Sequence, residues 1–229
     1  MYETEYTGQN RIVDFMYGVY GLMSGALAVT TVTAYYVSTI PNISTTLFAS
    51  PMLMTLIFVG QIALVIGLSA MIQKLTFPMA LSMFMVYAIS VGVTTSLIFK
   101  IYTFGSIVQT FAVAAGMFGV TSIFGYLTGA DLSKLGNVMM MALWGIIIAL
   151  VVNLWLQNPM IDLLLSAVGV VVFTALTAYD TQKIKQMGQH MMGSGQMASK
   201  VAVLGALTLY LDFINLFLFL LRFMGRRRD

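Results

Sequence analysis

Two aspartates stand out because strongly apolar sequence surrounds them. Asp212 lies within LTLYLDFINLFLFLLRF, ten residues before the nearest cation in line, Arg222. Asp180 lies near the end of the preceding apolar run, where it follows Thr174 and Thr177 at three-residue spacing on one helix face. A carboxylate inside an apolar helix is costly unless it is paired or solvated. These two acids are therefore the first candidates for chemistry.

The sequence predicts that Asp180 and Asp212 pair with each other. One loop joins their two runs, so the two helices are expected to be neighbours. Two carboxylates in contact cannot both be ionised cheaply, so the pair shares a proton and responds to pH. The alternative is two interfacial aspartates that reach water separately. On ideal helices Asp212 lies about 18 Å in from Lys200, so contact requires the last helix to begin before the membrane or to tilt.

Other polar side chains accompany the acids. Thr208 and Asn215 flank Asp212 at spacings of four and three residues, and Thr177 lies one turn before Asp180. With backbone carbonyls and water, these oxygens and the two carboxylates suit a weak, hydrated Ca²⁺ site and no tightly bound cofactor. The absence of cysteine excludes disulfides, thiolate metal sites and a cysteine nucleophile.

The composition requires a membrane to hold these residues. Of 229 residues 59% are hydrophobic and 8% are charged, against roughly 25% charged in soluble domains. Residues 1–229 are interpreted as a single transmembrane domain, an all-α bundle, since strand-type alternation is missing. Seven runs are long enough to cross about 30 Å of hydrocarbon: 15–38, 52–72, 77–99, 105–127, 138–156, 160–181 and 201–222. The modest basic excess favours anionic lipid headgroups over nucleic acid as a partner.

The distribution of cations predicts a cytoplasmic N-terminus. If the runs alternate in direction, Lys100 is the one loop cation on the far side, and the others share the N-terminal side: Arg11, Lys74, Lys134, Lys183, Lys185 and Lys200. The arginines after residue 221 oppose this pattern. Either the last segment spans and places them outside, which we favour, or it is re-entrant and returns them to the cytoplasm.

Further expectations concern the remaining polar and small residues. Asp131 and Asp162 lie near helix starts, where carboxylates interact with free backbone amides. The longest loop is expected over residues 181–200, with His190 as an incidental surface residue. Small residues at close spacing predict faces where helices approach closely: Gly18, Gly21 and Gly25, then Gly116, Gly119 and Ser122.

Lys74 allows two interpretations. It follows Gln73 at the cytoplasmic end of the second run, on the side where Asp180 is expected. It either pairs with the acids or is a snorkelling topology signal.

Several segments resemble one membrane protein family. LTAYDTQKIK (176–185), GALTLYLDFINLFLFLLRF (205–223) and FAVAAGMFGVTSIFGY, together with seven runs, resemble the Bax inhibitor-1 family in its bacterial inner-membrane branch. The resemblance implies seven helices around a central one, a pH-sensitive calcium leak, and a paired-aspartate sensor matching Asp180 and Asp212. In bacterial relatives an arginine near the end of the second helix latches onto the pair. Lys74 stands there in this sequence and offers a point charge instead of a bidentate fork.

Three functions follow from these observations. The first is a calcium leak gated by the aspartate pair. The second, implied by one member of the family, is an interaction protein that modulates a membrane-bound AAA protease. The third is an intramembrane aspartyl protease, which also pairs two aspartates on neighbouring helices. This sequence has TLYLD where those enzymes have a glycine-rich GxGD setting, so no enzyme is predicted.

Overall fold

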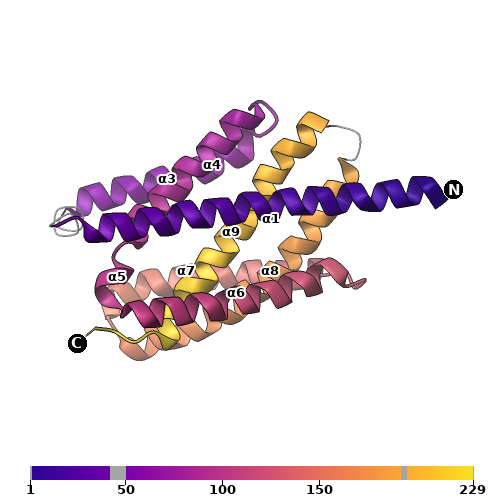
Figure 1. Cartoon of the computed structure of the whole chain (residues 1–229). Coiled ribbons are helices and arrows are strands. Elements are labelled where there is room, and N and C mark those ends of the chain that lie inside the picture. The colour runs from indigo at the N-terminus through magenta and orange to yellow at the C-terminus, as the bar shows by residue number, and fades with distance from the viewer. Residues whose placement is uncertain (1, 42–49, 192–194, 229) are drawn as a thin grey trace. The chain divides into compact units, whose positions relative to one another are not determined.

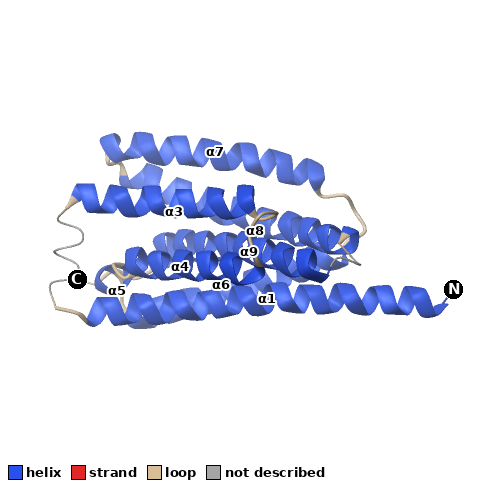
Figure 2. Ribbon diagram, turned by 90° about the horizontal axis from the view of Figure 1, so that it is seen from above, coloured by secondary structure: helices blue, strands red, loops and turns tan. Residues whose placement is uncertain are grey.

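A computed structural model describes residues 2–41, 50–191 and 195–228 of the chain, and these are almost entirely helical (Figure 2). Within these ranges the one strand-type pairing is an isolated antiparallel bridge between Tyr102 and Arg227. In the described part of the chain, seven helices are long and apolar enough to cross a membrane. The prediction of an all-α membrane bundle is confirmed. The helices are α1 (Tyr2–Thr39), α3 (Pro51–Met71), α4 (Phe77–Thr95), α5 (Ile98–Ile101), α6 (Phe104–Leu127), α7 (Ser133–Leu156), α8 (Pro159–His190) and α9 (Gly195–Met224).

The helix starts follow local sequence signals. The side chain of Ser50 accepts from the amide of Leu53 before α3, and that of Thr76 accepts from Met79 before α4. Each cap is followed by a proline in the first turn, where the missing N–H costs nothing. These breaks are the ones that the turn residues predicted.

The chain divides into two compact units that share α8 and α9. Unit 1 comprises Met1–Ile101 with Gln186–Tyr210, and unit 2 comprises Tyr102–Lys185 with Leu211–Asp229 (Figure 1). The boundary on α9 falls between Tyr210 and Leu211, so this continuous helix contributes its first half to one unit and its second half to the other.

Unit 1 has a polar contact at its core. Gly92 of α4 approaches α1 so closely that an added Cβ would lie 2.8 Å from the Thr30 carbonyl oxygen. Thr30 Oγ1 donates to the carbonyl of Ala88 at 2.9 Å and also contacts Tyr210 Oη at 2.6 Å. Because the threonine has one hydroxyl proton and uses it on Ala88, Tyr210 is the donor. The Tyr210 ring is fully buried between the edges of Phe84 and Tyr87.

In unit 2, α9 ends beside the starts of α6 and α8. Arg222, in the last turn of α9, pairs with Asp162 in the first turn of α8. After the helix, the carbonyl of Arg226 accepts from the amide of Thr103, and the amide of Arg226 donates to Ser106 Oγ. An unbroken 30-residue helix ending there favours seven crossings over a re-entrant last segment. Within the apolar window of α9, 67% of the residues are buried, against 33% or less in the other candidate spans.

The predicted loop over residues 181–200 is wrong. Helix α8 continues to His190 and α9 begins at Gly195. The extension is held by packing, because Thr181 and Ile184 are buried and Gly188 lies against the Phe15 ring. The segment TQKIKQMGQH is polar, and a helix can continue beyond the apolar part of its sequence. His190 is exposed, and its Nδ1 lies 2.7 Å from the Gln186 carbonyl oxygen.

The predicted small-residue faces are mostly wrong as well. An added Cβ at five of these glycines would meet nothing within 4 Å: Gly18, Gly21, Gly25, Gly116 and Gly119. Ser122 alone of that set is buried. Close approach occurs instead at isolated glycines such as Gly125 and Gly136. Spacing within one helix identifies a small-residue face but not whether a neighbour covers it.

Candidate functional site: a buried carboxyl pair

Asp180 and Asp212 come together in unit 2. Their side chains hydrogen-bond to each other, one from α8 and the other from α9. Only 7% of Asp180 and 4% of Asp212 is exposed. Helix α9 begins at Gly195, five residues before Lys200.

One oxygen of the pair has no partner. Among the side chains that the structure describes, Asp212 Oδ2 is the one buried polar atom without a hydrogen bond. An unsatisfied buried polar atom costs about 1–3 kcal/mol, and more when it is charged. Asp212 Oδ2 is thus an unsatisfied buried acceptor, at a position where an apolar side chain would avoid this cost.

The predicted supporting polar residues hydrogen-bond within their own helices. Thr177 Oγ1 donates to the carbonyl of Phe173, Thr208 Oγ1 to Leu204, and Asn215 Nδ2 to Leu211. Each bond reaches back four residues along the helix, which is the common behaviour of such side chains in apolar surroundings. Their donors are thus used locally and leave Asp212 Oδ2 unsatisfied.

The residues around Asp180 on α8 tie that helix to the hairpin of α6 and α7. Thr181 and Ser122 of α6 hydrogen-bond through their hydroxyl groups at 2.8 Å. Gln182 brackets the connecting loop: its Oε1 accepts from the amide of Leu132 at 2.9 Å and its Nε2 donates to the carbonyl of Ala130 at 2.8 Å. Sequence reasoning missed this bracket because it placed Gln182 in a loop.

Lys185 adds a contact at the end of α6. Its Nζ donates to the carbonyl of Tyr126 at 2.7 Å and lies 4.6 Å from the centre of the Tyr126 ring. A cation at a helix C-terminus is favourable because the last carbonyls lack amide partners.

Two glycines make this packing possible. A Cβ on Gly125 of α6 would lie 2.2 Å from the carbonyl oxygen of Ala178, and one on Gly136 of α7 would lie 2.5 Å from the ring of Tyr179. Ala178 and Tyr179 immediately precede Asp180. The α8 segment that carries the acid is therefore held by direct contact from two helices.

The two candidate cations lie in different places. Lys183 is one turn after Asp180 on α8, acts electrostatically on that carboxyl, and lies 5.7 Å from the centre of the Tyr179 ring. Lys74 belongs to unit 1, where it is exposed in the turn between α3 and α4. Its role as a latch stays a prediction. In the sequence, Lys183 is interpreted as one of the cations on the N-terminal side of the membrane.

Metal-binding residues are few. Within the described residues no group of three or more histidine, cysteine, aspartate or glutamate side chains lies close enough to hold an ion. The two carboxyls could supply at most four of the six to eight oxygens that Ca²⁺ takes.

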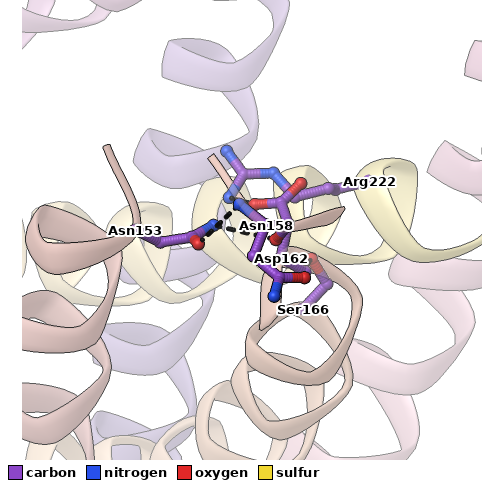
Figure 3. A network of polar contacts seen from close by, with 5 residues as sticks. All are labelled: Asn153, Asn158, Asp162, Ser166 and Arg222. Atoms are coloured by element: carbon purple, nitrogen blue, oxygen red, sulfur yellow. Dashed lines mark hydrogen bonds and ion pairs between the residues drawn. The ribbon is translucent and has the colours of Figure 1, made fainter. Parts of the chain in front are cut away.

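The opposite end of unit 2 has a second polar network (Figure 3). Asn153 of α7 brackets the turn to α8, accepting from the amide of Asn158 at 3.1 Å and donating to its carbonyl at 3.3 Å. Asn158 Oδ1 in turn caps α8 by accepting from the amide of Met160 at 2.9 Å. Asp162 pairs with Arg222 at 3.2 Å, with both side chains partly exposed. Asp162 lies in the first turn of α8, as predicted, and its side chain pairs with Arg222, while Asn158 caps the helix.

Asp131 behaves as predicted for a residue near a helix start. Its Oδ1 accepts from the amide of Ser133, the first residue of α7, at 2.9 Å. The Ser133 hydroxyl and then its amide lower the pKa of the Asp131 carboxyl.

The sequence is similar to known proteins along nearly its whole length. Residues 12–229 match the family described as "Inhibitor of apoptosis-promoting Bax1". Inner membrane protein YbhL of Escherichia coli K12 is 46% identical over 215 residues, covering 93% of this chain and 92% of that protein. An uncharacterized protein of Borreliella burgdorferi is 43% identical over 94% of this chain and 93% of its own length, and one of Deinococcus radiodurans is 36% identical over 96% and 93%. The chain therefore belongs to the Bax inhibitor-1 family of membrane proteins.

Proposed function

We propose that this protein is a pH-sensitive calcium leak of a bacterial inner membrane, gated by Asp180 and Asp212. The observation that carries the proposal is the buried carboxyl pair joining α8 to α9, with one oxygen left unsatisfied. A stable core gains nothing from such a pair, since apolar side chains of similar volume would be as good or better. A gate that responds to protons, by contrast, requires titratable groups such as this carboxyl pair.

In the closed state the pair shares one proton. The shared proton makes the hydrogen bond between the two carboxyl groups and leaves a single negative charge. Loss of that proton puts two like charges in direct contact where little water screens them, and the repulsion is larger than at a surface. Deprotonation therefore pushes α8 and α9 apart.

The surrounding contacts decide which helix yields. On α8, Tyr179, Thr181 and Gln182 are held by the hairpin of α6 and α7. On α9, the Oδ2 atom of Asp212 has no hydrogen-bond partner among the described residues. We expect α9 to move away from this fixed segment of α8, against the packing that buries most of α9, so that the site opens from the α9 side.

The same event creates the calcium site. A fully ionised pair carries two negative charges, and Ca²⁺ can complete its shell with water and carbonyl oxygens. Such a site is weak, and conduction needs binding that is favourable enough for entry and weak enough for release. Because protons compete for the carboxylates, calcium binding weakens as the pH falls.

The orientation proposed has a cytoplasmic N-terminus. With seven crossings the end of α9 then lies on the periplasmic side, together with the starts of α6 and α8 that it contacts in unit 2. A topology reporter fused after Asp229 is expected to report a periplasmic location. A cytoplasmic signal would reverse the proposed orientation or restore the re-entrant segment.

Calcium flux in proteoliposomes tests the function. Wild-type protein is expected to pass more calcium at alkaline than at acidic pH. Asp212→Asn retains a donor for the bridge and removes the second charge, so flux should be low and independent of pH. Asp212→Ala removes the bridge as well, so flux should not fall at acidic pH and calcium binding should be weak throughout. If both variants keep the wild-type pH profile, the carboxyl pair is not the gate.

Lys74 and Lys183 provide paired arms of this experiment. If Lys74 latches the closed state by pairing with an ionised carboxylate, Lys74→Gln raises flux at neutral pH. Lys183→Gln removes a positive charge next to Asp180, which disfavours the ionised pair and moves the flux profile to more alkaline pH. An unchanged flux in Lys74→Gln would leave that lysine as a topology signal.

The alternative function is modulation of a membrane-bound AAA protease, and it rests on resemblance alone. It requires a protease to co-purify with the protein, both with wild type and with a variant in which both aspartates are replaced. Co-purification together with no calcium flux at any pH would favour this alternative over the leak.

A further inference from the structure

The arginines after residue 221 form an exposed cationic surface at the C-terminal end of unit 2. Four arginines are exposed there: Arg222, Arg226, Arg227 and Arg228. The one ion pair that the structure records among the described residues is between Arg222 and Asp162. The charges of Arg226, Arg227 and Arg228 are thus not neutralised by a carboxylate of the described chain.

The backbone of Arg226 and Arg227 is held in place by hydrogen bonds. The amide of Gly225 donates to the carbonyl of Leu221 at 2.9 Å and continues the last turn of α9. Arg226 is held by two hydrogen bonds, to Ser106 Oγ at 2.8 Å and from the amide of Thr103 at 3.1 Å. Arg227 forms the bridge with Tyr102. A topology signal needs only the charges, whereas a fixed backbone is what a binding site needs.

Apolar side chains lie next to this surface. Phe104 begins α6, Phe223 and Met224 end α9, and each is about half exposed. In a membrane protein such side chains face the acyl chains, so the arginines that follow them along the chain lie at the level of the lipid headgroups.

We propose that Arg226, Arg227 and Arg228 form a binding site for the headgroup of an anionic phospholipid. Guanidinium groups suit it because they bind phosphate oxygens through paired hydrogen bonds. The apolar neighbours favour a lipid over free phosphate, because only a lipid has both a phosphate group for the arginines and acyl chains for the apolar side chains. The charge complementarity is independent of the acid pair, so this site does not rest on the proposed calcium leak.

Lipid retention by the purified protein tests the proposal. The intact protein, in a neutral detergent, is given equal amounts of phosphatidylglycerol and phosphatidylcholine, and bound lipid is counted by native mass spectrometry. The test variant is Arg227→Gln/Arg228→Gln. The matched control, Arg11→Gln/Lys134→Gln, removes the same formal charge from other exposed cations. Ser106→Ala keeps every charge and removes one tether of Arg226.

Wild type and the matched control are expected to retain phosphatidylglycerol preferentially. The double arginine variant should lose this preference by roughly fivefold for each arginine removed. Ser106→Ala should also weaken it, since the arginines are then less well fixed. Three results would overturn the proposal: no lipid preference in wild type, an equal preference in the double arginine variant, or displacement of the lipid by inorganic phosphate. An unchanged preference in Ser106→Ala would overturn the requirement for a fixed backbone.

Discussion

At each end of unit 2 a side-chain amide hydrogen-bonds to the backbone of a connecting segment, but the two amides differ in burial. At one end Gln182 brackets the loop between α6 and α7, and at the other Asn153 brackets the turn between α7 and α8. Gln182 is buried and reaches a loop 50 residues away in sequence, whereas Asn153 is partly exposed and reaches a turn five residues away. The acids differ in the same way. Asp180 and Asp212 are buried against each other, while Asp162 faces an arginine near water.

This difference in burial bears on the proposed response to pH. An exposed ion pair such as that of Arg222 and Asp162 contributes about 0.2–1 kcal/mol and is weakened by salt. A buried pair of like groups is sensitive to a single proton, because the low local dielectric magnifies both attraction and repulsion. We therefore expect substitutions near Asp180 to change both stability and pH response, and those near Asp162 to change stability slightly.

The largest effect on stability is expected at Gly125. Gly125→Ala places a Cβ 2.2 Å from the carbonyl oxygen of Ala178, and neither backbone can yield easily. The free energy of unfolding should fall by about 3 kcal/mol, at the upper end of overpacking costs. It is measured by unfolding of the purified protein in detergent.

Gly116→Ala is the matched control for Gly125→Ala. It lies on the same helix, but its added Cβ meets nothing within 4 Å. That variant should be unchanged or more stable by about 0.5–1 kcal/mol, because alanine favours the helix. Equal effects of the two substitutions would contradict the close approach of α6 to α8.

A smaller effect is expected from removing the Gln182 bracket. Gln182→Ala leaves the buried amide of Leu132 without its acceptor and should cost about 1–2 kcal/mol. Gln182→Ala should also make calcium flux change more gradually with pH. Without the Gln182 hydrogen bonds α8 can move together with α9, so that deprotonation separates the two helices less. Asn153→Ala, the corresponding change at the other end, should cost less, because water can replace its bonds, and should leave the pH response intact. If Asn153→Ala had the larger effect on both measurements, the two ends would not differ as argued.

These comparisons show what the sequence could predict. The spans, the proline-marked helix starts and the pairing partners Asp180 and Asp212 follow from hydropathy and from polar residues in apolar runs. The bracket by Gln182 and the contacts at Gly125 and Gly136 could not be predicted, because they depend on which helices touch. The length of α8 was missed for a related reason: hydropathy marks the part of a helix that lies in lipid, and the polar turns of Thr181–His190 are stabilised by protein contacts.

The smallest effect is expected at Asp131, which tests whether exposure or location decides the pH response. Asp131 is at the same end of unit 2 as Gln182, but it is exposed. Its pKa is lowered from the ordinary value of 3.8, first by the Ser133 hydroxyl and then by the Ser133 amide. A carboxyl group whose pKa is lowered on folding contributes stability above its unfolded pKa, and the contribution is lost as the pH falls through the lower, folded value. The melting temperature of wild type should therefore fall slightly more than that of Asp131→Asn as the pH drops below about 4, and the two should respond alike at neutral pH. Because the group is in water, calcium flux and its dependence on pH should be the same in both proteins. A shifted flux profile in Asp131→Asn would mean that location at this end, and not burial of the carboxyl pair, confers the sensitivity to protons.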